Sequence, residues 1–159
     1  MPKPLVQPSK SIFLPSNPVK NSPLNGVANR FGSFAAPPEQ LEALKKVESQ
    51  LADPESKRKP SELTPEYARN QARSIKPEFF VGVGICSHLG CSPSDKFQMG
   101  PQASLPDDWQ GGFLCPCHGS TFDMAGRVYK NKPAPDNLEV PPHMYLSETR
   151  LLIGEDKKA

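Results

Sequence analysis

The sequence has few residues that can bind a soft metal or form a disulfide: of its 159 residues, 4 are cysteine and 3 are histidine. It also lacks any run of the roughly 18–20 apolar residues that a membrane-spanning helix needs. No signal peptide with a basic start and an apolar middle can be recognised. The net charge of +2 is small and evenly spread, which argues against nucleic acid as a partner. What remains is one small domain with a modest core.

The scarce cysteines and histidines are concentrated in two six-residue segments, box one (Cys86–Cys91) and box two (Cys115–Ser120). Together the boxes hold all four cysteines and two of the three histidines. The candidate ligands are Cys86, His88 and Cys91 in box one, and Cys115, Cys117 and His118 in box two. This concentration predicts one metal centre, although six candidates exceed the four positions of a tetrahedral site.

A symmetric choice of ligands takes one cysteine and one histidine from each box. The ligands are then Cys86, His88, Cys115 and His118. This choice leaves one spare cysteine in each loop, and the two spares could form a disulfide between the loops. Two thiolates and two imidazoles suit a [2Fe–2S] cluster in which two histidines bind one of the irons. The same donors suit a structural zinc ion, so the ligand count leaves both metals open.

Three features of the boxes favour the iron–sulfur cluster. Each box mixes thiolate and imidazole donors, whereas structural zinc sites usually use Cys-x2–4-Cys and His-x3–5-His pairs. Glycine and proline surround the donors, as in loops that bring backbone N–H groups close to sulfur. The residues Phe79–Ile85 are β-branched, aromatic and glycine, which is typical of a strand. Cys86 therefore follows a strand and does not lie on a zinc-finger helix.

The two boxes, together with Lys132–Pro135, resemble the Rieske iron–sulfur subunits of ubiquinol–cytochrome c reductase. The similarity extends from about residue 38 to the C-terminus, and Cys115–Tyr129 is similar to the proteobacterial members. The resemblance implies a mainly β fold: a Rieske-type antiparallel β sandwich with a small cluster-binding subdomain and one surface helix. It also implies one [2Fe–2S] cluster per subunit.

The resemblance implies a role for individual residues. Cys86 and Cys115 would bind the inner iron, and His88 and His118 the outer iron. His118 would also contact the quinol, and the two histidines would couple electron uptake to proton uptake. Cluster contacts would also come from Ser120, as a donor to a bridging sulfide, and from Leu89 and Pro133, as shielding residues. A disulfide between Cys91 and Cys117 would join the two loops and indicates an oxidising compartment.

The implied function is electron transfer from ubiquinol to a c-type cytochrome, in a complex with cytochrome b. The implied location is the bacterial inner membrane, with the cluster domain on the periplasmic side. The long gap between the boxes and the extra cysteine pair favour this quinol-oxidising branch. The first alternative is a soluble Rieske ferredoxin-like carrier, and the second is a structural zinc-binding module. Many members carry a tyrosine where this chain has Phe122, which predicts a lower reduction potential here.

The sequence departs from the family at its N-terminal end, where no anchor, hinge or early strand of the base sheet can be recognised. Three regions are predicted. Residues 1–36 are a disordered proline-rich segment, residues 37–76 a surface helix with a charged connecting loop, and residues 77–159 the Rieske domain, with its cluster-binding part at about 85–136. Within these regions we expect a helix from Pro37 to near Asp53 and a turn of helix around Glu66–Asn70. After these we expect a loop over 93–110, a hairpin over Thr121–Tyr129, and strands at Asn137–Val140, His143–Leu146 and Leu151–Ile153. The basic residues of the connecting loop should form a solvated face, and His143 should have a surface or half-buried position.

Overall fold

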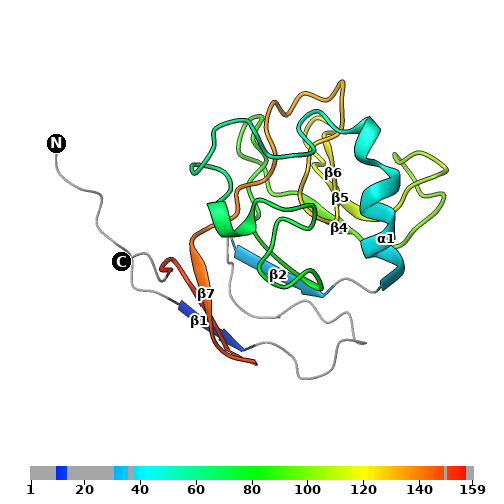
Figure 1. The fold of residues 1–159 in the computed structure, drawn as a ribbon. Coiled ribbons are helices and arrows are strands. Elements are labelled where there is room, and N and C mark those ends of the chain that lie inside the picture. Colours follow the sequence, from blue (N-terminus) through cyan, green and yellow to red (C-terminus); the bar gives the residue numbers. More distant parts are fainter. Residues whose placement is uncertain (1–9, 14–30, 36–37, 149, 157–159) are drawn as a thin grey trace, which may run out of the picture.

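The computed structural model describes residues 10–13, 31–35, 38–148 and 150–156. These residues form three small antiparallel sheets, with one α-helix and two short 3-10 helices outside them (Figure 1). The predicted fold class, mainly β with antiparallel sheets and one surface helix, is confirmed. In the described part of the chain, no helix is both long enough and apolar enough to span a membrane.

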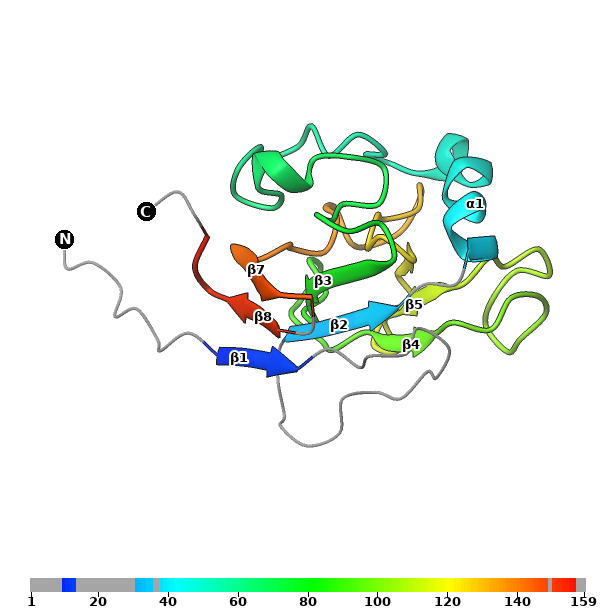
Figure 2. The same ribbon diagram turned by 60° about the horizontal axis from the view of Figure 1, so that its bottom comes forward.

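Two of the sheets form the base of the molecule. The first has the strand order β1-β8-β7, with β1 at Lys10–Phe13, β8 at Arg150–Ile153 and β7 at His143–Ser147. The second pairs β2 (Phe31–Ala35) with β3 (Phe79–Val83). Side chains of β3 and β8, namely Val81, Leu151 and Ile153, pack into one small core. The base is therefore built from strands at both ends of the chain (Figure 2).

The prediction that residues 1–36 are disordered is wrong for β1 and β2. β1 lies between Pro8 and Pro15, β2 follows Pro23, and each strand pairs along its full length with a strand far away in the sequence. They also supply early base strands that the sequence did not reveal. Local composition could not show this, because the stabilising partners lie beyond the segment itself. The rest of the segment, 1–9 and 14–30, is outside the described residues.

The third sheet carries both boxes. Its strands are β4 (Ser94–Lys96), β5 (Gly112–Leu114) and β6 (Thr121–Asp123), in that order. Box one lies just before β4, and box two connects β5 to β6. The prediction of a loop throughout 93–110 is therefore wrong for β4, which pairs with β5. Gly112 allows β5 and β6 to approach, because a Cβ there would lie 2.0 Å from the carbonyl oxygen of Phe122.

Helix α1 spans Pro38–Lys46, so it ends earlier than predicted. A 3-10 helix, η1, follows at Glu48–Gln50. Leu44, Val47 and Leu51 recur at steps of three and four residues in this region, and all three are buried. The turn of helix predicted in the connecting loop is present as η2, Glu66–Ala68.

Two predicted strands and the predicted position of His143 need correction. Asn137–Val140 is not a strand, because its N–H groups bond to separate segments: Leu138 donates to Gly126 and Val140 donates to Leu63. Likewise, the second half of the hairpin over Thr121–Tyr129 is reduced to an isolated bridge between Phe122 and Val128. His143 is fully buried, with 1% of its surface exposed. Its Nδ1 lies 2.7 Å from the Pro141 carbonyl oxygen, and its ring meets the edge of Tyr67.

Candidate metal centre

The two boxes fold into the same kind of loop. In box one, the N–H of Cys86 donates to the carbonyl of Cys91, and the N–H of Gly90 donates back to Cys86. In box two, Cys115 donates to Ser120, and Gly119 donates back to Cys115. The glycines have φ values of +83° and +78°, a backbone region that favours glycine. Two short segments 29 positions apart, counted from residue 86 to residue 115, thus present their side chains in the same way.

A disulfide joins the two loops. The sulfur atoms of Cys91 and Cys117 are bonded, and their Cα atoms lie 6.5 Å apart. This confirms the predicted pairing. The bond holds box one beside box two, and Cys86 and Cys115 remain as free thiols.

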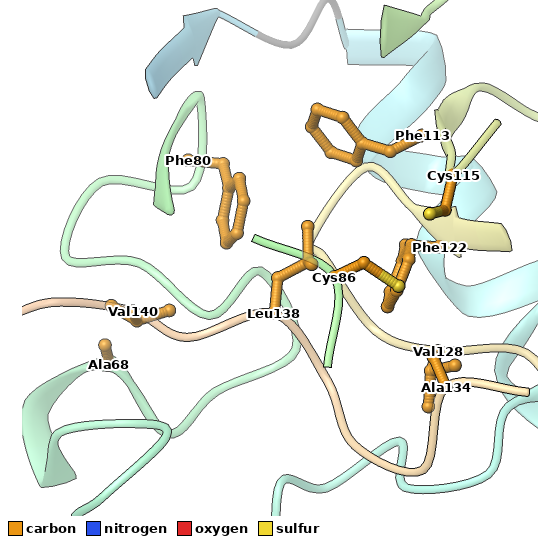
Figure 3. Packing of buried hydrophobic residues seen from close by; sticks show 10 residues of the cluster. All are labelled: Ala68, Phe80, Cys86, Phe113, Cys115, Phe122, Val128, Ala134, Leu138 and Val140. Atoms are coloured by element: carbon orange, nitrogen blue, oxygen red, sulfur yellow. The ribbon is translucent and has the colours of Figure 1, made fainter. Parts of the chain in front are cut away.

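The free thiols lie at the inner end of the site. Both cysteines are 2% exposed and belong to the main hydrophobic core. Figure 3 shows both cysteines among the rings and aliphatic side chains of that core. Burial raises the pKa of the Cys86 thiol, although the N–H of His88 donates to its sulfur. Holding this group as a thiolate therefore requires a nearby cation.

The two box histidines lie together at the outer end of the site. Their ring centroids are 4.7 Å apart, and the rings are nearly perpendicular. His88 is half-buried, and its Nδ1 is buried without a hydrogen-bond partner among the described residues. An unpartnered buried ring nitrogen is costly unless it binds something. His118 is exposed, so one edge of the site faces solvent.

Ser120, the last residue of box two, contacts the proline loop, which we define as residues 132–136. Its side chain is fully buried, and its hydroxyl accepts the N–H of Ala134 at 2.9 Å. The same hydroxyl bonds to the sulfur of Cys86. The oxygen accepts the hydrogen bond from Ala134, and the hydroxyl donates its own hydrogen to the sulfur of Cys86. Pro133 is exposed on the outer side of the same loop.

Two further predicted positions have contrasting surroundings. Leu89 is 71% exposed and is the most exposed large apolar side chain among the described residues. It therefore projects from box one into solvent. Phe122 is fully buried and packs in the same core cluster as the two free cysteines. Its ring has no hydroxyl and cannot donate to a sulfur atom.

A set of polar residues that the sequence reading missed braces the proline loop. The hydroxyl of Ser87 donates to the Asp136 carbonyl at 2.7 Å and accepts the N–H of the same residue. The Lys59 ammonium lies 2.6 Å from the Asp136 carboxylate, which raises the pKa of the lysine. The Arg58 guanidinium donates to the Pro135 carbonyl. The basic residues of the connecting loop gave no sign of this role, because charged clusters usually form solvated faces.

Two buried arginines support the turn that follows box two. The Asp123 carboxylate accepts the backbone N–H and the Nε–H of Arg127, the latter at 2.7 Å. Arg73 is fully buried and donates to the carbonyls of Ala125, Gly126 and Leu138. Burial lowers the pKa of Arg73 to about 10. The prediction of a solvated basic face is therefore wrong for this residue, which ties three segments together.

The donors fit a two-metal cluster better than a single ion. Among the described residues, the three sulfur atoms of Cys91, Cys115 and Cys117 are the only group of three or more candidate ligand atoms within 4.8 Å of one another. Two of these sulfurs are bonded together in the disulfide and cannot act as thiolates. No three ligand atoms from the two free thiols and the two box imidazoles lie within 4.8 Å of one another.

The comparisons with known proteins agree with this geometry. Residues 64–142 match the Rieske [2Fe-2S] domain family. The chain is 54% identical over 120 residues to the ubiquinol-cytochrome c reductase iron-sulfur subunit of Allochromatium vinosum, covering 76% of this chain and 56% of that protein. It is 41% identical over 108 residues to the subunit of the same name from Rhodospirillum rubrum, covering 68% of this chain and 52% of that protein. It is 46% identical over 86 residues to the mitochondrial cytochrome b-c1 complex subunit Rieske-1 of Arabidopsis thaliana, covering 54% of this chain and 27% of that protein.

The chain spans about half the length of the bacterial relatives that it matches. The matched family segment contains both boxes, the disulfide between them and the proline loop. The resemblance noted in the sequence is confirmed, and residues 64–142 of this chain form a Rieske [2Fe-2S] domain.

Proposed function

We propose that Cys86, Cys115, His88 and His118 hold one [2Fe–2S] cluster in this chain. Two buried free thiols lie at the inner end of the site, and the buried, unpartnered Nδ1 of His88 lies at the outer end. When bound, such a cluster supplies one-electron chemistry at a potential of roughly −150 to +300 mV. Ser120, whose proton is directed at the Cys86 sulfur, stabilises negative charge on the sulfur atoms.

The spacing of the donors supports a cluster over the zinc alternative. A tetrahedral zinc ion holds its donors at about 2.0–2.3 Å from one centre, so all four donors lie within about 4 Å of one another. The two free thiols and the two imidazoles do not form such a compact group. Two bridged metals, with the thiolates on one and the imidazoles on the other, do not require all four donors to lie within that distance of one another.

The exposed edge of the histidine pair suits proton-coupled electron transfer. His118 is exposed and can meet a partner molecule, whereas His88 is half-buried behind it. A metal-bound imidazole keeps one ring nitrogen free, and that nitrogen can accept or release a proton near neutral pH. The exposed ring of His118 would accept the hydrogen bond of a quinol hydroxyl and take up its proton. Leu89, exposed and next to His88 in box one, offers apolar contact to the same partner.

We assign the whole protein to electron transfer within a quinol–cytochrome c reductase. It would take an electron from ubiquinol and pass it to a c-type cytochrome, beside cytochrome b and on the periplasmic side of the bacterial inner membrane. The observation that carries this assignment is the pair of disulfide-linked loops with an exposed histidine edge. The names of the bacterial relatives support it. An oxidising compartment agrees with the disulfide.

Spectroscopy and metal analysis test the cluster. The purified chain should contain two irons and two acid-labile sulfides, and should give the rhombic EPR signal of a histidine-ligated cluster on reduction. His118→Gln should abolish this signal. His143→Gln is the matched control, because His143 is buried at the base and lies outside the boxes. One zinc ion per chain, without labile sulfide, would overturn the ligand assignment.

Reconstitution tests the physiological role. Addition of the loaded chain to bacterial membranes that lack their own Rieske subunit should restore electron transfer from ubiquinol to cytochrome c. A Leu89→Ala variant should bind the cluster normally, with an unchanged EPR signal, but should restore less activity. A loaded chain that never reacts with quinol in these membranes, yet reduces a soluble oxidoreductase, would support the ferredoxin-like carrier instead.

A further inference from the structure

Three sulfur atoms meet at the junction of the two boxes. The Sγ atom of Cys115 lies within 4.8 Å of both Sγ atoms of the Cys91–Cys117 disulfide. Cys115 is buried and carries a free thiol. A thiol next to a disulfide can attack one of its sulfurs, and the rate depends on access and on which sulfur is attacked.

We infer that the metal-free chain rearranges its disulfide by itself, and that a cluster bound to Cys115 prevents this rearrangement. The Cys115 thiol attacks the Cys91 sulfur and forms a Cys91–Cys115 bond. The Cys91–Cys117 bond breaks, and the proton lost by Cys115 is taken up by the Cys117 thiolate. One disulfide and two thiols are present before and after the step, so neither an oxidant nor a reductant is needed.

The surroundings favour attack on the sulfur of Cys91. Its bonded partner, Cys117, is exposed, so the departing thiolate is released into water. Attack on Cys117 would instead free the half-buried Cys91 and would join two residues separated only by Pro116. A disulfide normally needs Cα atoms about 4.4–6.8 Å apart and correctly directed Cβ atoms. Cysteines on two facing loops meet this requirement more easily than neighbours on one tight loop.

The rearrangement would remove one of the four proposed ligands. Cys115 would be consumed in the new disulfide, and Cys117 would carry the free thiol. The chain could then no longer bind the cluster through Cys86 and Cys115. The cluster could then rebind only after the reverse exchange, in which the Cys117 thiol attacks the Cys91 sulfur and releases Cys115. Insertion of the cluster before or during formation of the native disulfide would avoid this delay. The exchange itself concerns the metal-free chain, whereas the protection by the cluster rests on the proposed function.

The test is disulfide mapping of the full chain under oxygen-free, non-reducing conditions. The cluster is removed with a chelator, and samples taken over time are denatured and blocked with N-ethylmaleimide. Peptides are then sequenced by mass spectrometry, in which fragmentation before Pro116 separates Cys115 from Cys117. We expect the label to move from Cys115 to Cys117 in most molecules within hours, the usual range for disulfide reshuffling.

Two variants and the loaded chain serve as controls. Cys115→Ser lacks the attacking sulfur and should keep the native disulfide. Cys86→Ser keeps the attacking sulfur and should rearrange like the natural chain. The loaded chain should keep the Cys91–Cys117 bond over the same period.

The outcomes distinguish the two proposals. If label stays on Cys86 and Cys115 in the metal-free chain while circular dichroism shows a retained fold, the rearrangement does not occur. Loss of both free thiols would indicate oxidation and would also overturn the inference. If the loaded chain rearranges as fast as the metal-free chain, Cys115 does not bind the cluster, and the proposed ligand set fails instead.

Discussion

Removal of the disulfide should cost this protein a large part of its stability. The change is the double substitution Cys91→Ala with Cys117→Ala, which leaves no spare thiol to compete for metal. The bond links residues 26 positions apart. The chain-entropy relation for a loop of that size gives a stabilisation of about 3.5 kcal/mol at 25 °C. The free energy of unfolding of most domains is only about 5–15 kcal/mol, so the variant should be clearly less stable than the natural chain.

Guanidinium denaturation of the loaded proteins measures this effect. Circular dichroism follows the fold, and visible absorption follows the cluster. With a slope of about 4 kcal/mol per molar guanidinium, the variant's midpoint should be lower by about 0.9 M. Both proteins release the cluster on unfolding, so its contribution largely cancels in the difference. The control is Ser92→Ala, an exposed position next to Cys91, where no shift is expected.

A midpoint within about 0.2 M of the natural chain would refute this reasoning. It would mean that the proposed cluster and the packing of the boxes already hold the two loops together without the disulfide. A lower midpoint for the cluster absorption alone, with an unchanged midpoint for the fold, would limit the role of the bond to local positioning of the ligand loops.

Three further predictions concern the surroundings of the centre. Phe122→Tyr should raise the midpoint potential by about 40 mV, the equivalent of one hydrogen bond of about 1 kcal/mol to sulfur; an unchanged or lower value in an EPR-monitored titration would contradict this. Lys59→Ala should remove the ion pair with Asp136 and accelerate loss of the cluster to a chelator by up to about fivefold. Lys57→Ala is the control: it removes an exposed ion pair with Glu55, outside the proline loop, and should not change this rate. Burial lowers the pKa of His143 in the folded chain. Because the unfolded chain therefore binds more protons than the folded chain, the guanidinium midpoint of the protein should fall as the pH drops through and below about 6.5, the ordinary histidine pKa. This pH dependence should weaken in His143→Gln; an equal dependence in both proteins would exclude His143 as its source.

The metal-binding boxes could be predicted from the sequence because their information is local. Each box places thiolate and imidazole donors within six residues, and its glycine permits the turn that closes the loop. The pairing of Cys91 with Cys117 followed from the resemblance and is confirmed. The burial of Leu44, Val47 and Leu51, in and just after α1, could also be predicted, because helical periodicity is visible in any short window of sequence.

Other features depended on partners far away in the chain. Strands β1 and β2 are short segments within a proline-rich region, and only pairing with β8 and β3 makes them strands. Arg73 and Lys59 belong to a charged stretch of sequence that is typical of a solvated face. Arg73 is nevertheless buried beneath the turn after box two, and Lys59 forms an ion pair with Asp136 in the proline loop.

The sequence by itself determined which donors this protein offers to a metal, because ligand chemistry is a property of residue types at short spacing. Only the tertiary structure decided which sulfur atoms are bonded and which histidine ring nitrogens are buried without a partner. It also decided which charges are buried. The physical reason is that burial and long-range pairing depend on what surrounds a residue in three dimensions, and neither is encoded in the few residues on either side of it.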